Sequence, residues 1–188
     1  MKYFIIAGEA SGDLHGSNLM KGLKEVDENA EFQFWGGDLM QKVGGELKMH
    51  YKDIAFMGLM TVILNLRTIF KNLAKCKNQI LMFKPDVIIL IDYPGFNLRI
   101  AKFAKRKNIK VFYYISPKIW AWKESRIKKI KAFVDRMFVI FPFEKNFYKK
   151  HNYPVEFAGN PLVEAIEDRK NKDESFETFT QKNGLSEK

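Results

Sequence analysis

The chain has 188 residues, 46% of them hydrophobic, which suffices for one domain with a sizeable core and excludes wholesale disorder. Its net charge of +10 predicts anionic partners: nucleic acid, an acidic membrane surface or a phosphorylated ligand. The single cysteine excludes an intrachain disulfide framework and fits a reducing compartment. The three histidines are scattered and do not have the spacing of metal ligands. No apolar run has the ~20 residues of a membrane-spanning helix.

Residues 2–7 are predicted to form a first buried strand, so no signal peptide is expected, and a turn of small residues follows at 8–16. Such a turn lets the backbone approach a ligand, and the N-terminus of the helix that follows favours anions. Its spacing is neither the dinucleotide-binding G-x-G-x-x-G nor a P-loop. An ordinary strand-to-helix turn with Ser11 or Asp13 as N-cap explains the residues equally well.

A second strand is predicted at 31–35 and a long helical segment at 55–83. In that segment the apolar residues exceed one narrow stripe, and Arg67, Lys71 and Lys75 recur every fourth residue on one face. An apolar face flanked by cations suits a helix in a membrane interface. The residues alone favour the alternative, a crossover helix packed on the sheet with a solvated basic edge.

The next predicted strand, at 87–91, is an unbroken run of β-branched residues and leucine without polar alternation, which is typical of a strand buried on both faces. The run ends at Asp92, and Pro94 cannot continue a central strand. In open α/β sheets, ligands bind at the carboxyl ends of the strands. Asp92 is therefore expected to be a site residue or the cap of the next helix.

A strand at 110–115 leads into a loop in which Trp120 and Trp122 are interleaved with three cations, among them Lys118 and Arg126. The indoles can stack on a ring or cover an acyl chain while the cations bind phosphate, and nucleic-acid binding would use the same residues. The alternative is that both indoles lie in the core and the cations at the surface. At least one of the two indoles is expected in the core.

Further strands are predicted at 136–140 and 154–158. Strands and helices thus alternate from end to end, which predicts an α/β fold with a doubly wound, parallel, Rossmann-like sheet. From residue 167 onward the composition becomes polar. We therefore expect a Rossmann-like domain at 1–166 and a polar connector at 167–188 that leads into a further domain.

Six stretches, in their order along the chain, resemble the lipid-A-disaccharide synthase family. They are Gly8-Glu9-Ala10-Ser11-Gly12-Asp13, Met57-Gly58, Asp92-Tyr93-Pro94-Gly95-Phe96-Asn97, Ser116-Pro117-Lys118-Ile119-Trp120-Ala121-Trp122, Phe141-Pro142-Phe143-Glu144 and Gly159-Asn160-Pro161-Leu162. The Ser-Pro-x-x-Trp-Ala-Trp and Asp-x-Pro-x-Phe-Asn stretches are the most specific. Gly95 departs from the family pattern, which has Asp there, so a second carboxylate is missing while Asp92 is retained.

The resemblance implies the N-terminal, acceptor-binding half of a two-domain inverting glycosyltransferase of the GT-B type, inactive by itself. The whole enzyme is expected to transfer diacylglucosamine from UDP-diacylglucosamine to the 6-hydroxyl of diacylglucosamine 1-phosphate. The products would be the disaccharide precursor of lipid A and UDP. No metal, cofactor or nucleic acid is expected. The resemblance also implies a cytoplasmic protein, peripheral on the inner face of the inner membrane of a Gram-negative bacterium.

An inverting transfer needs a base for the acceptor hydroxyl, and a carboxylate at the mouth of a sheet can serve; we predict that Asp92 is this base. The resemblance places Glu9 near the same cleft, where it is expected to position the acceptor, with the base role as its alternative. The expected substrate contacts are Ser11, Gly12, Asp13, Asn97, Ser116, Lys118, Trp120, Trp122 and Asn160. The expected contacts with an anionic membrane are Met57, Met60, Ile63, Arg67, Lys71 and Lys75.

Two other classes of protein compete with this interpretation. A nucleotide-cofactor enzyme has little support, because the glycine fingerprint is absent and the second strand ends in Trp35-Gly36-Gly37 rather than in an acidic residue. A basic nucleic-acid-binding module rests on the net charge, and it predicts base-independent binding that falls steeply with salt.

Overall fold

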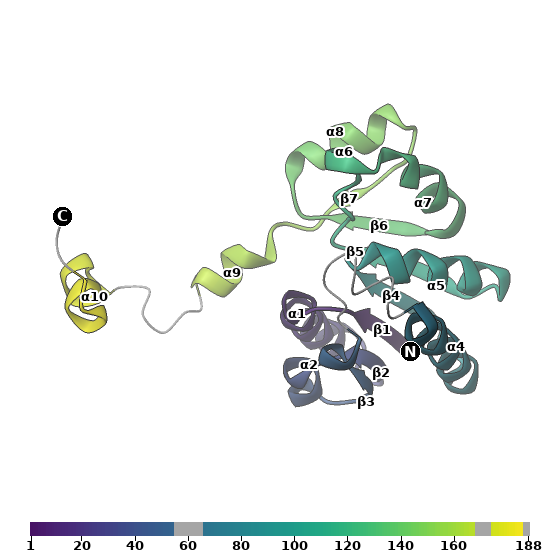
Figure 1. Cartoon of the computed structure of the whole chain (residues 1–188), viewed down its shortest axis with the longest axis horizontal. Coiled ribbons are helices and arrows are strands. Elements are labelled where there is room, and N and C mark those ends of the chain that lie inside the picture. The colour runs from purple at the N-terminus through teal and green to yellow at the C-terminus, as the bar shows by residue number, and fades with distance from the viewer. Residues whose placement is uncertain (55–65, 168–173, 186–188) are drawn as a thin grey trace. The chain divides into compact units, whose positions relative to one another are not determined.

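The computed structural model describes residues 1–54, 66–167 and 174–185, and the chain forms two compact units, Met1–Ala158 and Gly159–Lys188. Among the described residues of the first unit, seven parallel strands form one sheet in the order β3-β2-β1-β4-β5-β6-β7 (Figure 1). The strands are β1 Lys2–Ala7, β2 Glu31–Gly36, β3 Glu46–His50, β4 Val87–Ile91, β5 Lys110–Tyr114, β6 Arg136–Val139 and β7 Glu156–Phe157. The helices are α1 Ala10–Val26, α2 Asp38–Val43, α4 Leu66–Phe83, α5 Pro94–Arg106, α6 Ile119–Trp122, α7 Ile127–Phe133 and α8 Pro142–Lys150.

Helices cover both faces of this sheet. Ile89 of β4 belongs to the same apolar cluster as Met20 of α1 and Met40 of α2. The adjacent Ile88 points the opposite way, into a larger cluster that includes Ile100 of α5 and residues of α4, α7 and α8. The doubly wound, parallel α/β arrangement that the sequence predicts is thus confirmed.

β4 is the central strand of the first unit. It pairs with β1 on one side and with β5 on the other, and all of its residues are buried. A strand that is covered on both faces has no solvated side, which explains why Val87–Ile91 shows no polar alternation. The residue after β4 therefore leaves the sheet at a fixed point, between two neighbouring strand ends.

The structure differs from the sequence-based expectation in three places. The sequence pattern does not predict β3, because this strand lies at the edge of the sheet and none of its residues is fully buried. β7 has only two residues and is shorter than the strand expected at 154–158. The loop expected after β5 contains α6 and a 3-10 turn at Glu124–Arg126.

α4 is a crossover helix that packs on the sheet through Leu73, Cys76 and Ile80. Burial raises the pKa of the Cys76 thiol well above its ordinary value, so the reactive thiolate is disfavoured. None of the described helices, α4 included, combines the length and the apolar character needed to cross a bilayer.

The outer side of α4 is basic. Arg67, Lys71 and Lys75 are exposed, and the helix contains no Asp or Glu. The apolar residues expected to contact a membrane lie outside the described residues, so their place stays a prediction: Met57, Met60 and Ile63.

The second unit contains α9 Pro161–Glu167 and α10 Phe176–Asn183. Asn160 precedes α9, and its Oδ1 accepts a hydrogen bond from the Leu162 N–H at 3.0 Å. Ser175 caps α10 in the same way, because its Oγ accepts the Thr178 N–H at 3.2 Å. Asn160 thus has a capping role in the structure, and its expected contact with substrate stays a prediction.

Asp13 of α1 fixes the start of α2. The N-cap residue of α2 is Gly37, which has no side chain to accept the first N–H groups of the helix. The buried Asp13 carboxylate takes this part: it accepts the N–H groups of Gly37, Leu39 and Met40 at 2.8, 3.0 and 3.1 Å. Asp13 therefore joins two helices, and its expected substrate contact stays a prediction.

We expect Asp13→Ala to lower the free energy of unfolding by roughly 2–4 kcal/mol, because three N–H groups at a helix terminus lose a charged acceptor. Urea unfolding followed by circular dichroism measures this loss. Asp38→Ala is the matched control, since Asp38 is an exposed carboxylate in the first turn of the same helix. An equal loss in the two variants would contradict the anchoring role of Asp13.

Candidate functional site

Three strand ends bring the polar candidates to one edge of the sheet. Glu9 follows β1, Asp92 follows β4 and Ser116 follows β5, and these three strands are parallel neighbours. Ala7 pairs with Ile91, and Ile91 pairs with Tyr114, so the strands end at the same level. This carboxyl edge is where open α/β sheets bind ligands.

Asp92 has an unusual proton affinity. Its pKa is raised to about 6, first by burial and then by the negative charge of Glu9, while Lys118 and Arg126 act in the opposite direction. A carboxylate with such a pKa is ionised at neutral pH and is a better proton acceptor than an ordinary aspartate. The end of the central strand thus carries a carboxylate of raised proton affinity.

The chain turns sharply at this carboxylate. Asp92 and Tyr93 both have positive φ angles, 41° and 46°. The Tyr93 hydroxyl donates a hydrogen bond to the Ile54 carbonyl at 3.2 Å, and its ring lies against Gly8, where a Cβ atom would be 2.5 Å from the ring. A glycine is therefore required at position 8 because the Tyr93 ring packs against it. The sequence of the turn does not reveal this requirement, since Tyr93 is distant along the chain.

The remaining residues of the first turn divide into two groups. Glu9 and Ser11 are exposed and available to a ligand at the start of α1. Gly12 is buried, and a Cβ atom there would lie 3.1 Å from Cβ of Ala7. On the neighbouring turn, a Cβ atom on Gly95 would meet no atom within 4 Å, so the aspartate of the family pattern would fit at this position.

Asn97 and Ser116 are buried and already have protein partners. Asn97 Nδ2 donates to the carbonyls of Ile91 and Asp92, at 3.2 and 2.8 Å. Ser116 Oγ donates to the Pro117 carbonyl at 3.1 Å and shares a hydrogen bond of 2.8 Å with the Tyr148 hydroxyl. Both residues therefore shape the walls of the site, and their expected substrate contacts stay predictions.

The expectation that Trp120 or Trp122 lies in the core is wrong. Their side chains are 39% and 65% exposed, because α6 turns Ile119 inward in their place. Trp120 packs edge to face on Phe143, with ring centroids 5.0 Å apart. Both indoles are thus available for contact with a ligand, beside the exposed Lys118.

Arg126 is one of the three cations that the sequence places around the two tryptophans, although it is not among the expected substrate contacts, and the structure adds it to the site. Its guanidinium carbon lies 5.2 Å from the Trp122 ring centroid, and the Lys123 ammonium lies 4.8 Å from the same centroid. Two cations over one exposed indole, together with Lys118, make this side of the site positive. Such a surface suits an anionic ligand with an apolar or ring-shaped part.

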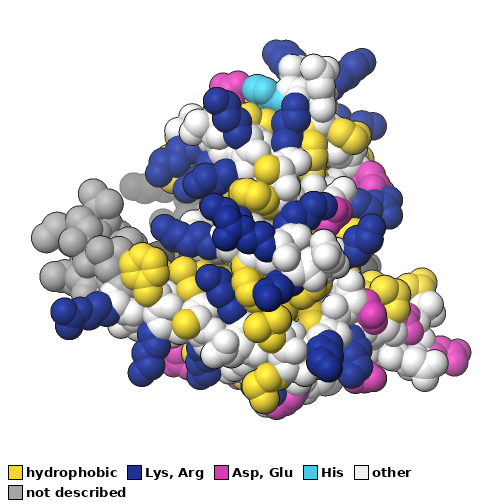
Figure 2. Space-filling view, turned by 90° about the vertical axis from the view of Figure 1, so that its right-hand side faces the viewer, with side chains coloured by type: hydrophobic (Ala, Val, Ile, Leu, Met, Phe, Trp, Pro, Cys, Tyr) yellow, Lys and Arg dark blue, Asp and Glu magenta, His cyan; other side chains and the backbone are white. Residues whose placement is uncertain are grey.

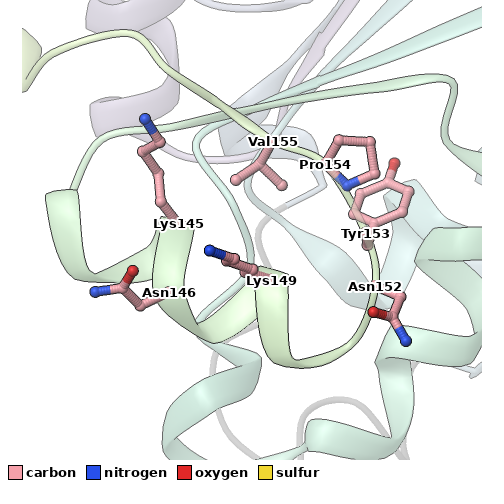
Figure 3. Close-up of a pocket in the computed structure, with 7 residues that line it drawn as sticks. All are labelled: Lys145, Asn146, Lys149, Asn152, Tyr153, Pro154 and Val155. Atoms are coloured by element: carbon pink, nitrogen blue, oxygen red, sulfur yellow. The ribbon is translucent and has the colours of Figure 1, made fainter.

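A hollow of about 450 Å³ between α8 and the segment before β7 is lined by none of these residues (Figure 3). Its walls include Lys145, Lys149, Asn152 and Tyr153. The two lysine side chains extend in different directions in Figure 3 and do not converge on one point. The hollow therefore lacks the arrangement of a binding site for a small anion.

A groove of about 550 Å³ runs between α4 and α5. Its walls combine apolar residues, among them Phe70 and Leu81, with the cations Lys77 and Arg99. Neither helix contains an acidic residue. Figure 2 views the side of the molecule on which these helices lie, where Lys and Arg outnumber Asp and Glu and hydrophobic side chains are exposed among them.

Within the described ranges, no three His, Cys, Asp or Glu side chains gather closely enough to hold a metal ion. The chemistry of the site in the described part of the chain therefore consists of one carboxylate of raised pKa, a second exposed carboxylate and a set of cations beside two indoles.

Residues 3–184 match the sequence model of a family described as lipid-A-disaccharide synthetase. The chain is 45% identical over 178 residues to the lipid-A-disaccharide synthase of Geobacter metallireducens, covering 95% of this chain and 46% of that protein. It is also 45% identical over 161 residues to the enzyme of Coxiella burnetii, covering 86% and 43%. The chain thus spans about half the length of the curated relatives it matches.

Solved structures of similar fold include the UDP-GlcNAc 2-epimerase of Neisseria meningitidis bound to UDP-GlcNAc, at a TM-score of 0.65 and 13% identity, with 96% of this chain and 52% of that chain covered. The UDP-N-acetylglucosamine 2-epimerase of Rickettsia bellii matches at a TM-score of 0.66 and 14% identity, with 99% and 52% covered. At these identities the likeness concerns the Rossmann-like α/β fold.

We expect Asp92→Asn to raise the free energy of unfolding at pH 7 by about 1–3 kcal/mol. The native carboxyl has a pKa of about 6, above the ordinary value of 3.8, so the folded state holds the proton more tightly. The carboxyl therefore favours folding below pH 4, and this contribution is lost as the pH rises through 6. Urea unfolding at pH 3.5 and pH 7 measures both states.

The gain of Asp92→Asn should nearly disappear at pH 3.5, where the Asp92 carboxyl is protonated in the folded state and mostly protonated in the unfolded state. Asp53→Asn is the control, because Asp53 is exposed and its substitution should change stability little at either pH. A variant that is no more stable than the unsubstituted chain at pH 7 would show that burial does not penalise the Asp92 carboxylate.

Proposed function

Because this chain belongs to the lipid-A-disaccharide synthase family, we propose that its strand-end site holds the acceptor sugar of a glycosyl transfer and that Asp92 is the general base. The observation that carries the proposal is a carboxylate with a pKa of about 6 at the end of the central strand. The acceptor in this proposal is diacylglucosamine 1-phosphate, and the donor is UDP-diacylglucosamine.

The proposed reaction is an inverting displacement. The 6-hydroxyl oxygen of the acceptor forms a bond to the anomeric carbon of the donor sugar while the bond from that carbon to the UDP oxygen breaks. The bonding electrons leave with UDP, and the hydroxyl proton passes to the Asp92 carboxylate. No metal or cofactor is needed for this balance.

The other groups of the site take supporting roles in the proposal. Glu9 is exposed beside Asp92, where it accepts hydrogen bonds from acceptor hydroxyls and raises the proton affinity of Asp92. Lys118 and Arg126 bind the acceptor phosphate, and Trp120 and Trp122 pack against its sugar or acyl chains. This division assigns the carboxylate of Glu9, the two cations and the two indoles to different parts of the acceptor.

The UDP part of the donor is proposed to bind in a second half of the protein. The chain spans about half of its relatives, and the polar segment from residue 167 is proposed to connect the halves. The leaving diphosphate needs cations or helix N-termini. We assign these groups to the second half, so the 188-residue chain alone is proposed to bind acceptor without catalysing transfer.

In a full-length protein, Asp92→Asn is expected to lower kcat by roughly 10²–10⁴-fold, because the amide keeps the size of the side chain but cannot accept the proton. A radiolabelled transfer assay with both lipid substrates measures the change. Circular dichroism and urea unfolding confirm that the variant is folded.

Glu9→Gln is the matched control for this prediction. If Glu9 positions the acceptor, its variant should mainly raise KM, and the acidic limb of the kcat profile should shift to lower pH as the charge that raises the Asp92 pKa is removed. Turnover near that of the unsubstituted enzyme in Asp92→Asn, with a large kcat loss in Glu9→Gln, would transfer the base role to Glu9.

We further propose that α4 docks the protein on an anionic membrane from the cytoplasmic side, at the inner face of the inner membrane of a Gram-negative bacterium. Supporting this, Arg67, Lys71 and Lys75 are exposed, and Phe70 between them is 61% exposed. The groove between α4 and α5 adds apolar surface and further cations. Acylated sugars reside in the bilayer, so a surface that binds the bilayer brings the site close to its substrates.

Replacement of Arg67, Lys71 and Lys75 by Gln should weaken binding to anionic vesicles about 100-fold, because each cation near such a surface contributes about 1 kcal/mol. Sedimentation of the chain with phosphatidylglycerol vesicles, and in parallel with neutral phosphatidylcholine vesicles, measures the effect. Stability should be unchanged, since the three side chains are exposed.

The matched control replaces three exposed lysines of α7 by Gln: Lys128, Lys129 and Lys131. It removes the same charge from another helix. Equal losses in the two triple variants would show that net charge alone drives binding, and equal binding to anionic and neutral vesicles would exclude the electrostatic attraction. Tighter binding to single-stranded DNA than to vesicles would favour the nucleic-acid alternative.

A further inference from the structure

Asp92 sits in a backbone conformation that it does not adopt by preference. Its φ angle of 41° and that of Tyr93, 46°, place two consecutive non-glycine residues in the left-handed region. Such a conformation persists only where the surrounding structure enforces it. The enforcing contacts are therefore part of what aims the Asp92 side chain.

Two buried side chains hold the Asp92 carbonyl. The Tyr113 hydroxyl donates to it at 2.5 Å, and Asn97 Nδ2 donates to it at 2.8 Å while also donating to the Ile91 carbonyl at 3.2 Å. The Asp92 N–H donates to the Tyr114 carbonyl at 3.3 Å. Both main-chain polar groups of Asp92 are thus bound, which fixes the position from which its side chain extends.

Tyr113 reaches this carbonyl from inside the sheet. It is fully buried on β5, in the apolar cluster that also contains Leu90 and Phe96, so its hydroxyl is a polar atom at the end of a packed ring. Burial raises the pKa of the Tyr113 hydroxyl well above its usual range, which keeps it a donor. A buried hydroxyl in such surroundings must have a hydrogen-bond partner, and the Asp92 carbonyl accepts its hydrogen bond.

Asn97 keeps its hydrogen bond to the Asp92 carbonyl although its own amide oxygen is unfavourably placed. Its side chain is fully buried, and its Oδ1 has no hydrogen-bond partner within the described residues. A buried acceptor without a partner is destabilising. Its amide group therefore serves the turn at Ile91 and Asp92 rather than the general stability of the core.

We propose that Tyr113 is a positioning residue, which together with Asn97 holds the Asp92 backbone so that the carboxylate faces the acceptor hydroxyl. This role rests on the proposed function of Asp92 as the base. Tyr113 itself touches neither substrate nor the reacting atoms. A rigid base kept in place before the substrate arrives needs no reorganisation in the transition state.

The first test is a titration that needs no turnover. Carbon-13 NMR of the 188-residue chain follows the Asp92 carboxyl in the unsubstituted chain and in Tyr113→Phe, which keeps the ring and removes the hydroxyl. Release of the turn should let the carboxyl move toward water, so its pKa should fall from about 6 toward the ordinary value. The charged groups around it, Glu9, Lys118 and Arg126, stay unchanged.

Tyr153→Phe is the matched control. The Tyr153 hydroxyl also donates to a main-chain carbonyl, that of Val134 at 3.0 Å, and its ring packs against the same apolar cluster. The control should leave the Asp92 titration unchanged. The same shift in both variants, or no shift in Tyr113→Phe, would overturn the proposal.

The second test uses the full-length enzyme. Tyr113→Phe should lower kcat about tenfold with little change in KM for the acceptor, because a misplaced base affects the chemical step rather than binding. In an Asp92→Asn background the same substitution should have no further effect, since Tyr113 acts through Asp92. An undiminished tenfold loss in that background would overturn the proposal.

Two outcomes separate this proposal from the proposed function. If Asp92→Asn retains turnover, the base assignment fails, while the titration still decides whether Tyr113 holds the carboxyl. If Tyr113→Phe does not fold, Asn97→Ser removes the other donor from the same carbonyl and should lower the Asp92 pKa in the same way. An Asn97→Ser chain with an unchanged titration would then refute the proposal.

Discussion

Parallel pairing of β1, β4 and β5 is the constraint on which the site depends. Because the three strands run in one direction and end at the same level, the residues that follow them must meet at one edge. β4 is paired on both sides and covered on both faces, so its end has little freedom to move. The position of Asp92 is therefore set by the whole sheet rather than by its own loop.

Several features of the site lower the stability of the first unit. The Asp92 carboxylate is partly desolvated, two consecutive residues have positive φ angles, and a buried acceptor on Asn97 lacks a partner in the described part of the chain. At the end of β5, the β-branched Ile115 has a φ angle of 62°. Strain concentrated at neighbouring strand ends is typical of sites in which the fold serves chemistry.

The sequence predicted most of the fold because its central strands are apolar without alternation and its helices alternate with them. It did not predict β3, where Leu47 and Met49 alternate with charged residues at a half-exposed edge. For Asp92, the end of a buried strand was a sufficient signal. The protein partners of Asp13, Asn97 and Ser116 were not predictable, because hydrogen bonds between distant segments leave no local pattern.

Other features of the site depend on packing between segments that are far apart in the chain. The sequence places Trp120 and Trp122 near the site but does not say which side of a short helix faces the core, and Ile119 takes that place. In the sequence, Tyr113 resembles any other residue of a buried strand. Its hydroxyl is important only because it donates a hydrogen bond to the Asp92 carbonyl.

The buried thiol under α4 gives the protein an internal reporter. Cys76 is the single cysteine of the chain, and it is sealed between the crossover helix and the sheet. A thiol reagent can reach it only when α4 separates from the sheet, so the labelling rate records the frequency of that opening. Vesicles that hold α4 against the sheet would slow the labelling of Cys76. Vesicles that pull α4 away from the sheet would accelerate it. The labelling rate of this thiol therefore distinguishes the two ways in which α4 can bind a bilayer.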